Sequence, residues 1–131
     1  MKPHEEWLYK ALHDIESSKL LFSKSKVLFD ISIYHTQQCA EKSLKAFLAY
    51  KEQELEKTHN LITLVNICIS LDTDFEKIQD AAIYLNPYST LFRYPEGELM
   101  PNLEETGEAI KLAEKIYNFV KNKIDLFSSK S

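Results

Sequence analysis

The stretch ISIYHTQQCAEKSLKAFLAY, residues 31–50, decides the fold class. Its apolar side chains recur at intervals of three, four and seven positions, at Ile33, Ala40, Leu44, Phe47 and Leu48. This spacing places side chains on one face of an α-helix. Polar residues fill most other positions, so the stretch predicts an amphipathic helix with one buried face. We expect residue 30, an aspartate, to be its N-cap and the polar tail 51–57 to fray or turn.

The same rhythm recurs on both sides of this stretch, which predicts a chain that is helical almost throughout. Before it, an apolar run begins at Pro3, a residue favoured in the first turn of a helix, and ends near residues 23–25. After it, a third and shorter helix is expected to start near Thr58 or His59.

Local start and stop signals predict the remaining helices. Thr73 and Glu76 have the spacing of a capping box and open a fourth helix, which the Asn-Pro pair at 86–87 stops. Asn102 and Glu105 repeat the capping-box spacing and open the last helix.

Composition excludes the main alternatives to a helical bundle. The chain has 131 residues, enough for one domain over 1–131, and only two glycines, Gly97 and Gly107. Loops that cradle phosphates need two or three glycines close together, so no such motif is present. There is no Asn-Gly or Asp-Gly pair for a tight hairpin, which argues against a barrel or sandwich. We predict an all-α, up-and-down bundle of four to five helices with one irregular loop at about 86–101.

Charge and cysteine content indicate a cytoplasmic protein. Cys39 and Cys68 lie within apolar periodic stretches and are expected to be buried, reduced thiols. No apolar run approaches the roughly 20 residues that cross a bilayer, so no membrane association is expected. The net charge of −4 offers no general attraction to nucleic acid, and no DNA partner is expected.

The irregular loop holds the chain's only arginine, Arg93, among aromatic residues that include Tyr88 and Tyr94. Long loops in compact domains often carry function, whereas a solvated connector with a turn at 95–97 is the alternative. The planar guanidinium suits either a bound phosphate or an internal ion pair with an acid such as Glu41. Both interpretations stay open.

Two further groups of residues could carry chemistry. A polar stripe of Gln38, Glu41, Lys42 and Lys45 runs along the second helix, where the alternative is a solvated face with a Glu41–Lys45 ion pair. His59 lies at a predicted helix boundary and could cap the helix or meet a ligand. The one Glu-x-x-His pattern, at 56–59, falls at a predicted break, so neither a metal nor a cofactor is expected.

Three motifs in order resemble one family. QQCAEKSLKA at 37–46, KTHNL at 57–61 and RYP at 93–95, together with Trp7, Ala11 and Asp14, are similar to the HEPN domains, nucleotide-binding domains of higher eukaryotes and prokaryotes. The resemblance covers essentially the whole chain. It implies a compact helical bundle, a homodimer, and in many members a small nucleotidyltransferase partner, in some cases as a toxin–antitoxin module.

The family that the chain resembles also includes metal-independent endoribonucleases. These carry an Arg that is followed, after four to six residues, by a His. Here those positions are Glu98, Leu99 and Met100, so the motif is incomplete. The leading prediction is therefore a non-catalytic or weakly catalytic module that binds a nucleotide or a protein partner. The alternatives are an endoribonuclease that uses Arg93 with His59 as a displaced base, and a purely structural dimerisation domain. The expected ligand-binding residues are Arg93, Tyr94, Lys42, Lys45, Gln38, Glu41, His59 and Tyr88.

Overall fold

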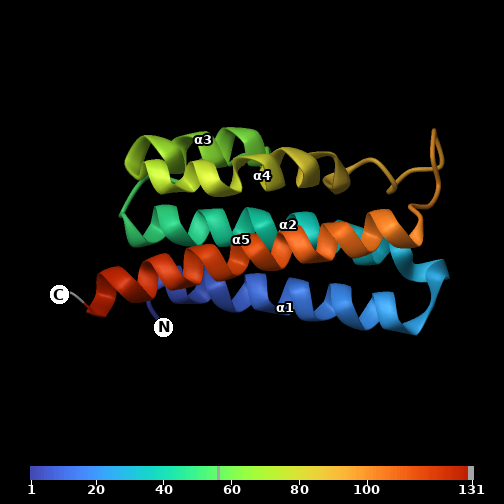
Figure 1. Ribbon diagram of the computed structural model, residues 1–131, viewed down its shortest axis with the longest axis horizontal. Coiled ribbons are helices and arrows are strands. Elements are labelled where there is room, and N and C mark those ends of the chain that lie inside the picture. Colours follow the sequence, from blue (N-terminus) through green and yellow to red (C-terminus); the bar gives the residue numbers. More distant parts are fainter. Residues whose placement is uncertain (56, 130–131) are drawn as a thin grey trace.

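The computed structural model describes residues 1–55 and 57–129, and within this part the chain forms five α-helices, three short 3₁₀ helices and no strand (Figure 1). Three helices are long: α1 (Pro3–Lys24), α2 (Phe29–Tyr50) and α5 (Leu103–Ser129). Two are shorter: α3 (Leu61–Leu71) and α4 (Gln79–Leu85). The prediction of an all-α bundle is confirmed.

The helices α2 and α5 form a central pair, and the other helices pack on its two sides. α1 lies along one side of this central pair, and α3 and α4 lie along the opposite side (Figure 1). Both chain termini lie at one end of the bundle. The turn between α1 and α2 and the irregular segment 90–102 lie at the other end.

The contact between α1 and α2 depends on two small buried serines. Ser18 Oγ donates a hydrogen bond to the carbonyl oxygen of Ser32 at 2.7 Å, and Ser32 Oγ donates to the carbonyl oxygen of Ser18 at 2.8 Å. The short side chains let the two helices approach closely, and each buried hydroxyl is satisfied by the other helix.

The core lies between α2 and the helices around it. The Phe47 and Phe75 rings lie 4.3 Å apart, and Phe119 of α5 contacts Phe75 edge-on. Cys39 and Cys68 are fully buried, as predicted, and burial raises the pKa of each thiol to about 12. Other large side chains of the core, all fully buried, are Ile33, Leu44, Leu48, Leu61, Leu64, Ile78, Leu85 and Ile116.

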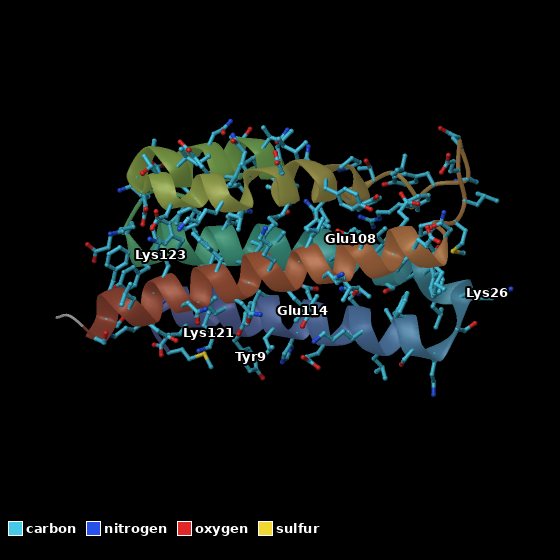
Figure 2. All side chains as sticks on the ribbon, viewed as in Figure 1. Tyr9, Lys26, Glu108, Glu114, Lys121 and Lys123 are labelled. Carbon is cyan, nitrogen blue, oxygen red and sulfur yellow. The ribbon has the colours of Figure 1, made fainter. Side chains whose placement is uncertain are left out.

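The outer faces of the bundle carry ion pairs, some between two helices and some within one helix. Glu114 and Lys121 project from α5 in Figure 2. The Glu114 carboxylate lies 2.5 Å from Lys19 Nζ of α1, and Lys121 pairs with Asp125 one turn later at 2.9 Å. Exposed pairs of this kind contribute about 0–1 kcal/mol each, so the core and not the surface charge holds the bundle together.

Two predicted helix starts are wrong. Asp30 lies in the first turn of α2 and is not its cap, because a 3₁₀ turn, η1 (Lys26–Leu28), leads directly into the helix. α3 begins at Leu61 and not near Thr58 or His59, because Asn60 caps it: Asn60 Oδ1 accepts hydrogen bonds from the backbone N–H groups of residues 62 and 63.

The fourth and fifth helices also depart from their predicted capping boxes. Asp72, not Thr73, is the cap, and residues Thr73–Ile78 (η2) form a 3₁₀ helix before α4 begins. Asn102 caps α5 as predicted, since its Oδ1 accepts the N–H of Glu105 at 2.7 Å. The Glu105 carboxylate does not return to Asn102; it accepts a hydrogen bond from the Tyr88 hydroxyl instead.

The irregular segment is shorter than predicted. Residues Asn86–Ser89 form a 3₁₀ helix, η3, that continues from α4. The chain bends at residues 94–97, where the sequence predicted a turn, and Gly97 adopts a φ of 90°, a conformation that residues other than glycine rarely take.

Candidate functional site

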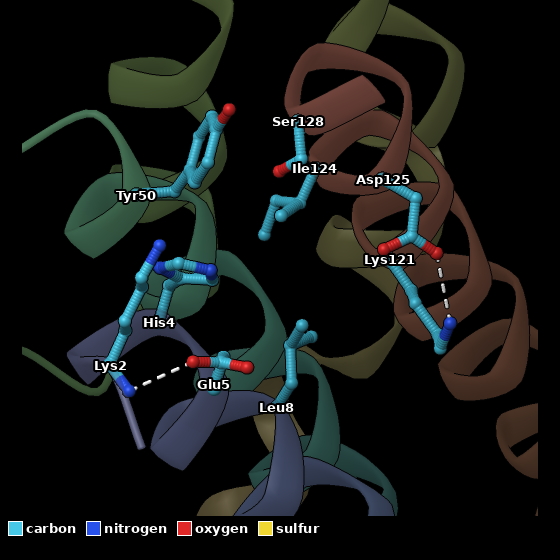
Figure 3. Close-up of a pocket in the computed structure, with 9 residues that line it drawn as sticks. All are labelled: Lys2, His4, Glu5, Leu8, Tyr50, Lys121, Ile124, Asp125 and Ser128. Carbon is cyan, nitrogen blue, oxygen red and sulfur yellow. Dashed lines mark hydrogen bonds and ion pairs between the residues drawn. The ribbon is translucent and has the colours of Figure 1, made fainter. Parts of the chain in front are cut away.

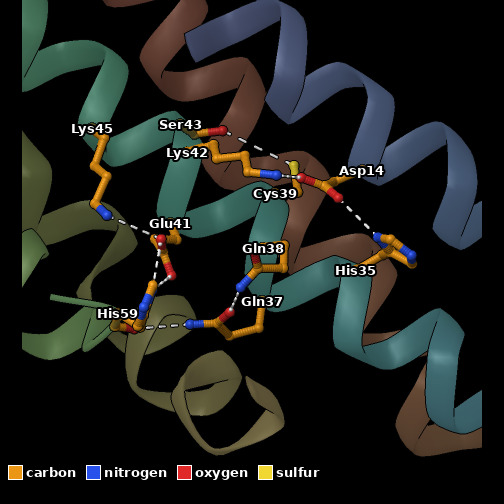
Figure 4. Close-up of polar contacts among 10 residues, drawn as sticks. All are labelled: Asp14, His35, Gln37, Gln38, Cys39, Glu41, Lys42, Ser43, Lys45 and His59. Atoms are coloured by element: carbon orange, nitrogen blue, oxygen red, sulfur yellow. Dashed lines mark hydrogen bonds and ion pairs between the residues drawn. The ribbon is translucent and has the colours of Figure 1, made fainter. Parts of the chain in front are cut away.

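Two polar clusters flank α2, and each contains a carboxylate, a histidine and a lysine (Figure 4). We call them the Asp14 cluster, which contains Asp14, His35 and Lys42, and the Glu41 cluster, which contains Glu41, Lys45 and His59.

The Asp14 cluster ties α1 to α2. Asp14 Oδ1 lies 2.8 Å from His35 Nδ1, and Asp14 Oδ2 accepts a hydrogen bond from Lys42 Nζ at 2.7 Å. Burial opposes ionisation of Asp14, but hydrogen bonds from His35 and Lys42 outweigh it and lower the pKa of the carboxyl below its usual range. The carboxylate is therefore held as the anion between two helices.

The Glu41 cluster joins α2 to the segment that precedes α3. Glu41 Oε2 accepts a hydrogen bond from Lys45 Nζ at 3.0 Å, and Glu41 Oε1 lies 3.0 Å from His59 Nδ1. Glu41 and Lys45 are buried, with 3% and 7% of their surface exposed, so the interpretation of this stripe as a solvated face is wrong. Trp7 of α1 covers the Lys45 ammonium, which lies 5.6 Å from the ring centre.

Side-chain amides of α2 hold the His59 backbone beside this helix. Gln37 Nε2 donates a hydrogen bond to the carbonyl oxygen of His59 at 2.9 Å, and Gln38 Nε2 donates to Gln37 Oε1 at 2.8 Å. At the start of α3, the backbone N–H of Leu61 donates to Asn86 Oδ1 at 2.8 Å, which ties this segment to η3. The His59 side chain itself remains 75% exposed.

Arg93 is exposed, and its guanidinium carbon lies 4.6 Å from the centre of the Tyr34 ring. Its backbone N–H donates to the carbonyl oxygen of Thr90 at 3.1 Å. Within residues 1–55 and 57–129 Arg93 forms no ion pair, so the interpretation of Arg93 as the partner of an acid such as Glu41 is wrong. Glu41 is instead contacted by Lys45 Nζ and by His59 Nδ1.

Arg93 and His59 line one cavity, of about 260 Å³, together with Tyr34, Gln38, Ser89 and Thr90. We call it the His59 cavity. A second cavity of about 300 Å³ shares two residues with it, and we call it the His35 cavity; it is lined by Asp30, Ile31, Tyr34, His35, Phe92 and Arg93. No carboxylate lines the His59 cavity. Its lining holds a guanidinium, an imidazole, three hydroxyls and an amide, all of which can donate hydrogen bonds to an anion.

Of the residues that the sequence singled out, the structure brings Gln38, His59 and Arg93 together in this cavity. Tyr88 lies in the core, where burial and its hydrogen bond to a carboxylate raise the pKa of the phenol. Tyr94 is exposed outside the residues that line the cavity.

The lysines of the stripe and Glu41 are also outside the lining of the cavity. Lys42, Lys45 and Glu41 are engaged in the two polar clusters. Their spacing along α2 was correct evidence of a shared stripe, which includes the Glu41–Lys45 pair. The other partners come from elsewhere, because Lys42 pairs with Asp14 of α1 and Glu41 contacts His59 before α3.

Sequence reasoning missed Tyr34, Ser89 and Thr90 as lining residues. A signal for Tyr34 existed, because it lies one helical turn before Gln38 and therefore on the same face of α2. Ser89 and Thr90 had no such signal, since their place beside α2 depends on how η3 packs.

A larger cavity of about 610 Å³ lies at the opposite end of the bundle, near both termini (Figure 3). Its lining mixes charges of both signs, and these pair locally. Lys121 pairs with Asp125, and the Glu5 carboxylate accepts the backbone N–H of Lys2. Its acids weaken it as an anion site, and we favour the His59 cavity.

No group of three His, Cys, Asp or Glu residues in the described part of the chain is arranged to hold a metal ion. No described helix combines the length and the apolar character that crossing a membrane requires.

Comparison with known proteins gives consistent results. The profile of the HEPN domain matches residues 4–123. Among solved structures, an archaeal HEPN homologue, ST0689, is 28% identical with a TM-score of 0.77, over 95% of this chain and 99% of that one. TT1696 from Thermus thermophilus is 26% identical with a TM-score of 0.80, over 94% of this chain and 99% of that one. The search of curated proteins found no match.

The chain therefore belongs to the HEPN domain family.

Proposed function

We propose that this HEPN domain is a nucleotide-binding module that holds a phosphate group in the His59 cavity. One observation carries the proposal: the only arginine of the chain is exposed, rests on Tyr34, has no acidic partner in the described part, and lines the same cavity as His59. A guanidinium in this state is free to form paired hydrogen bonds with two phosphate oxygens.

The remaining lining residues suit the same ligand. Because His59 Nδ1 faces the Glu41 carboxylate, Nε2 is the ring nitrogen left for a ligand. The hydroxyls of Ser89 and Thr90 supply two further donors without adding negative charge. Lys42 and Lys45 are no longer part of the proposed site, since each is committed to a carboxylate.

Calorimetric titration with AMP and with inorganic phosphate tests this function. We expect dissociation constants in the micromolar range or weaker for AMP, and a loss of at least tenfold in Arg93→Ala. Lys111→Ala, which removes an exposed cation from α5, is the matched control and should bind as the wild type does. Equal affinity in the wild type and Arg93→Ala would remove the proposed site.

The same module is proposed to work as a homodimer and with a protein partner such as a small nucleotidyltransferase, in a toxin–antitoxin-like arrangement. The family resemblance supports this part of the proposal. Light scattering of the purified chain tests the dimer, which should have twice the 15.3 kDa mass of the chain. A single species with the mass of one chain would contradict it.

A second candidate function is metal-independent cleavage of RNA. Its support is that His59, whose Nδ1 faces Glu41, lines the same cavity as Arg93. The cavity therefore brings together the arginine and the histidine that the chain lacks as a continuous motif. In that reaction the RNA 2′-OH attacks the adjacent phosphorus, the 5′-oxygen leaves, His59 transfers protons, and Arg93 stabilises the charge that develops.

Incubation of the protein with RNA in the presence of a chelator tests this candidate. Cleavage that disappears in both His59→Ala and Arg93→Ala would support it. Intact RNA after long incubation, or cleavage that survives either substitution, would reject it and leave binding as the function.

A further inference from the structure

The stacked Arg93 and Tyr34 side chains form the wall that the two cavities share. Both residues line the His59 cavity and the His35 cavity, and all other lining residues belong to only one of the two. Along α2, the His35 cavity takes Asp30 and Ile31, whereas the His59 cavity takes Gln38. At 1.5 Å per residue, residues 31–38 span about 10 Å of the helix. The two cavities are therefore neighbours on one face of α2.

Each cavity alone is small for a nucleotide. Pockets that bury most of a drug-sized ligand have volumes of roughly 300–1,000 Å³. The His59 cavity, at about 260 Å³, lies below this range and the His35 cavity, at about 300 Å³, lies at its lower limit. A nucleotide therefore needs both cavities, one for each of its chemically different halves.

The two cavities differ in charge. The His59 cavity has cationic and neutral donors and no acid, which favours a phosphate. The His35 cavity contains Asp30, whose Oδ1 accepts the backbone N–H of Ile31 at 2.9 Å. Within the described residues its second carboxylate oxygen has no protein partner. A carboxylate repels a phosphate but accepts hydrogen bonds from the hydroxyls of a ribose.

The His35 cavity also has apolar surface for a base. Ile31 is 45% exposed, and Phe92 and Tyr34 line the same cavity. A flat aromatic base gains contact with such surfaces whichever base it is. These apolar side chains and the Asp30 carboxylate together suit the nucleoside half of a nucleotide.

We propose that the ligand is a ribonucleotide that lies across the Arg93–Tyr34 stack, with its phosphate in the His59 cavity and its ribose hydroxyls on Asp30 in the His35 cavity. This inference rests on the proposed function, because it takes the phosphate site as given. It adds the orientation of the bound nucleotide and a preference for ribose, and it assigns that preference to Asp30.

Calorimetric titration of the wild type and Asp30→Ala with AMP, its 2′-deoxy and 3′-deoxy analogues, and inorganic phosphate tests the inference. A hydrogen bond to a charged acceptor is worth about tenfold or more in affinity, so the wild type should bind AMP about tenfold more tightly than at least one deoxy analogue. Asp30→Ala should lose this preference and keep its affinity for inorganic phosphate.

Asp80→Ala is the matched control, because Asp80 is also a first-turn acid but belongs to α4. It should leave all four affinities unchanged. Thermal melting of both variants verifies that each is folded, since a first-turn acid contributes to helix stability.

The outcomes separate the two proposals. If AMP and both deoxy analogues bind equally and depend on Arg93, the sugar preference is wrong and the phosphate site stands. If Asp30→Ala weakens inorganic phosphate as much as AMP, Asp30 acts on the whole cavity and the assigned direction is wrong. If neither AMP nor phosphate binds the wild type, the proposed function itself fails.

Discussion

The Asp14 cluster and the Glu41 cluster contain the same three kinds of side chain, but their histidines have different freedom. His35 is part of α2, and 28% of its side chain is exposed; His59 precedes α3, and 75% of its side chain is exposed. Both rings meet a nearly buried carboxylate through Nδ1. The comparison teaches that the carboxylate orients the ring in both places, whereas the exposure of the ring decides how far a ligand can reach it.

The lysines differ in the opposite sense. The side chain of Lys45 in the Glu41 cluster is 9% exposed, whereas the side chain of Lys42 in the Asp14 cluster is 26% exposed. The cluster with the more accessible histidine is therefore also the one with the more deeply buried lysine. This contrast ranks the expected effects of mutation.

The largest effect is expected for Glu41→Ala. The substitution leaves the Lys45 ammonium buried beside Trp7 without its carboxylate, a situation that costs about 3–5 kcal/mol. Urea denaturation at pH 7 measures the loss in the free energy of unfolding. Glu108→Ala, which removes an exposed acid from α5, is the control and should change stability by less than about 0.5 kcal/mol. A loss below about 1 kcal/mol in Glu41→Ala would show that Lys45 finds water or another partner.

Asp14→Ala should have a smaller effect, of about 2 kcal/mol. Lys42 and His35 keep about a quarter of their surface exposed, so water can replace part of what the carboxylate supplied. The same denaturation experiment measures it. A loss equal to or greater than that of Glu41→Ala would contradict the ranking of the two clusters by burial.

Acidification should weaken the Asp14 cluster progressively. The pKa of Asp14 is lower in the folded state than in the unfolded state, so the unfolded state binds more protons between the two values. The stabilising contribution is present above the unfolded value near 4 and is lost as the pH falls through the folded value. Urea denaturation at several pH values from 6 to 2.5 should therefore show a steeper decline below pH 4 in the wild type than in Asp14→Ala. Parallel curves would exclude this contribution.

The smallest effect on stability is expected for His59→Ala. Because its ring is mostly exposed, the loss should be below about 0.5 kcal/mol, whereas the less exposed His35 should cost about 1 kcal/mol when replaced by Ala. Binding should rank in the opposite order, with affinity for inorganic phosphate falling about tenfold in His59→Ala. Greater destabilisation by His59→Ala than by His35→Ala would show that His59 is a structural residue.

The sequence predicted the long helices correctly because their periodicity reflects burial over several turns. The cap signals were less reliable, because short 3₁₀ helices replace the expected helix starts. η1 leads into α2 before the acid at position 30, and the Thr-x-x-Glu pattern at 73–76 lies within η2, which Asp72 caps. Asn102 was predicted correctly because no 3₁₀ turn directly precedes α5 and its side chain accepts the backbone N–H of Glu105.

The candidate site could be predicted only in its parts. The sequence pointed to Arg93 and His59 separately, 34 positions apart, and could not show that they line one cavity. Their meeting depends on the hydrogen bond from Gln37 to the His59 carbonyl, which draws the segment before α3 back along α2. The burial of Glu41 and Lys45 was equally hidden, because an i,i+4 pair has the same spacing on an exposed or a covered face.

The hydrogen bond between the N–H of Leu61 and Asn86 Oδ1 gives the His59 cavity a mechanical property. It fastens the wall that carries His59 to the wall that carries Ser89 and Thr90. The two walls should then move relative to α2 as one rigid unit and should not move apart from each other. The width between them is thus set before a ligand arrives, and adjustment to ligand size falls to the Arg93 side chain, which is held by stacking rather than by an ion pair.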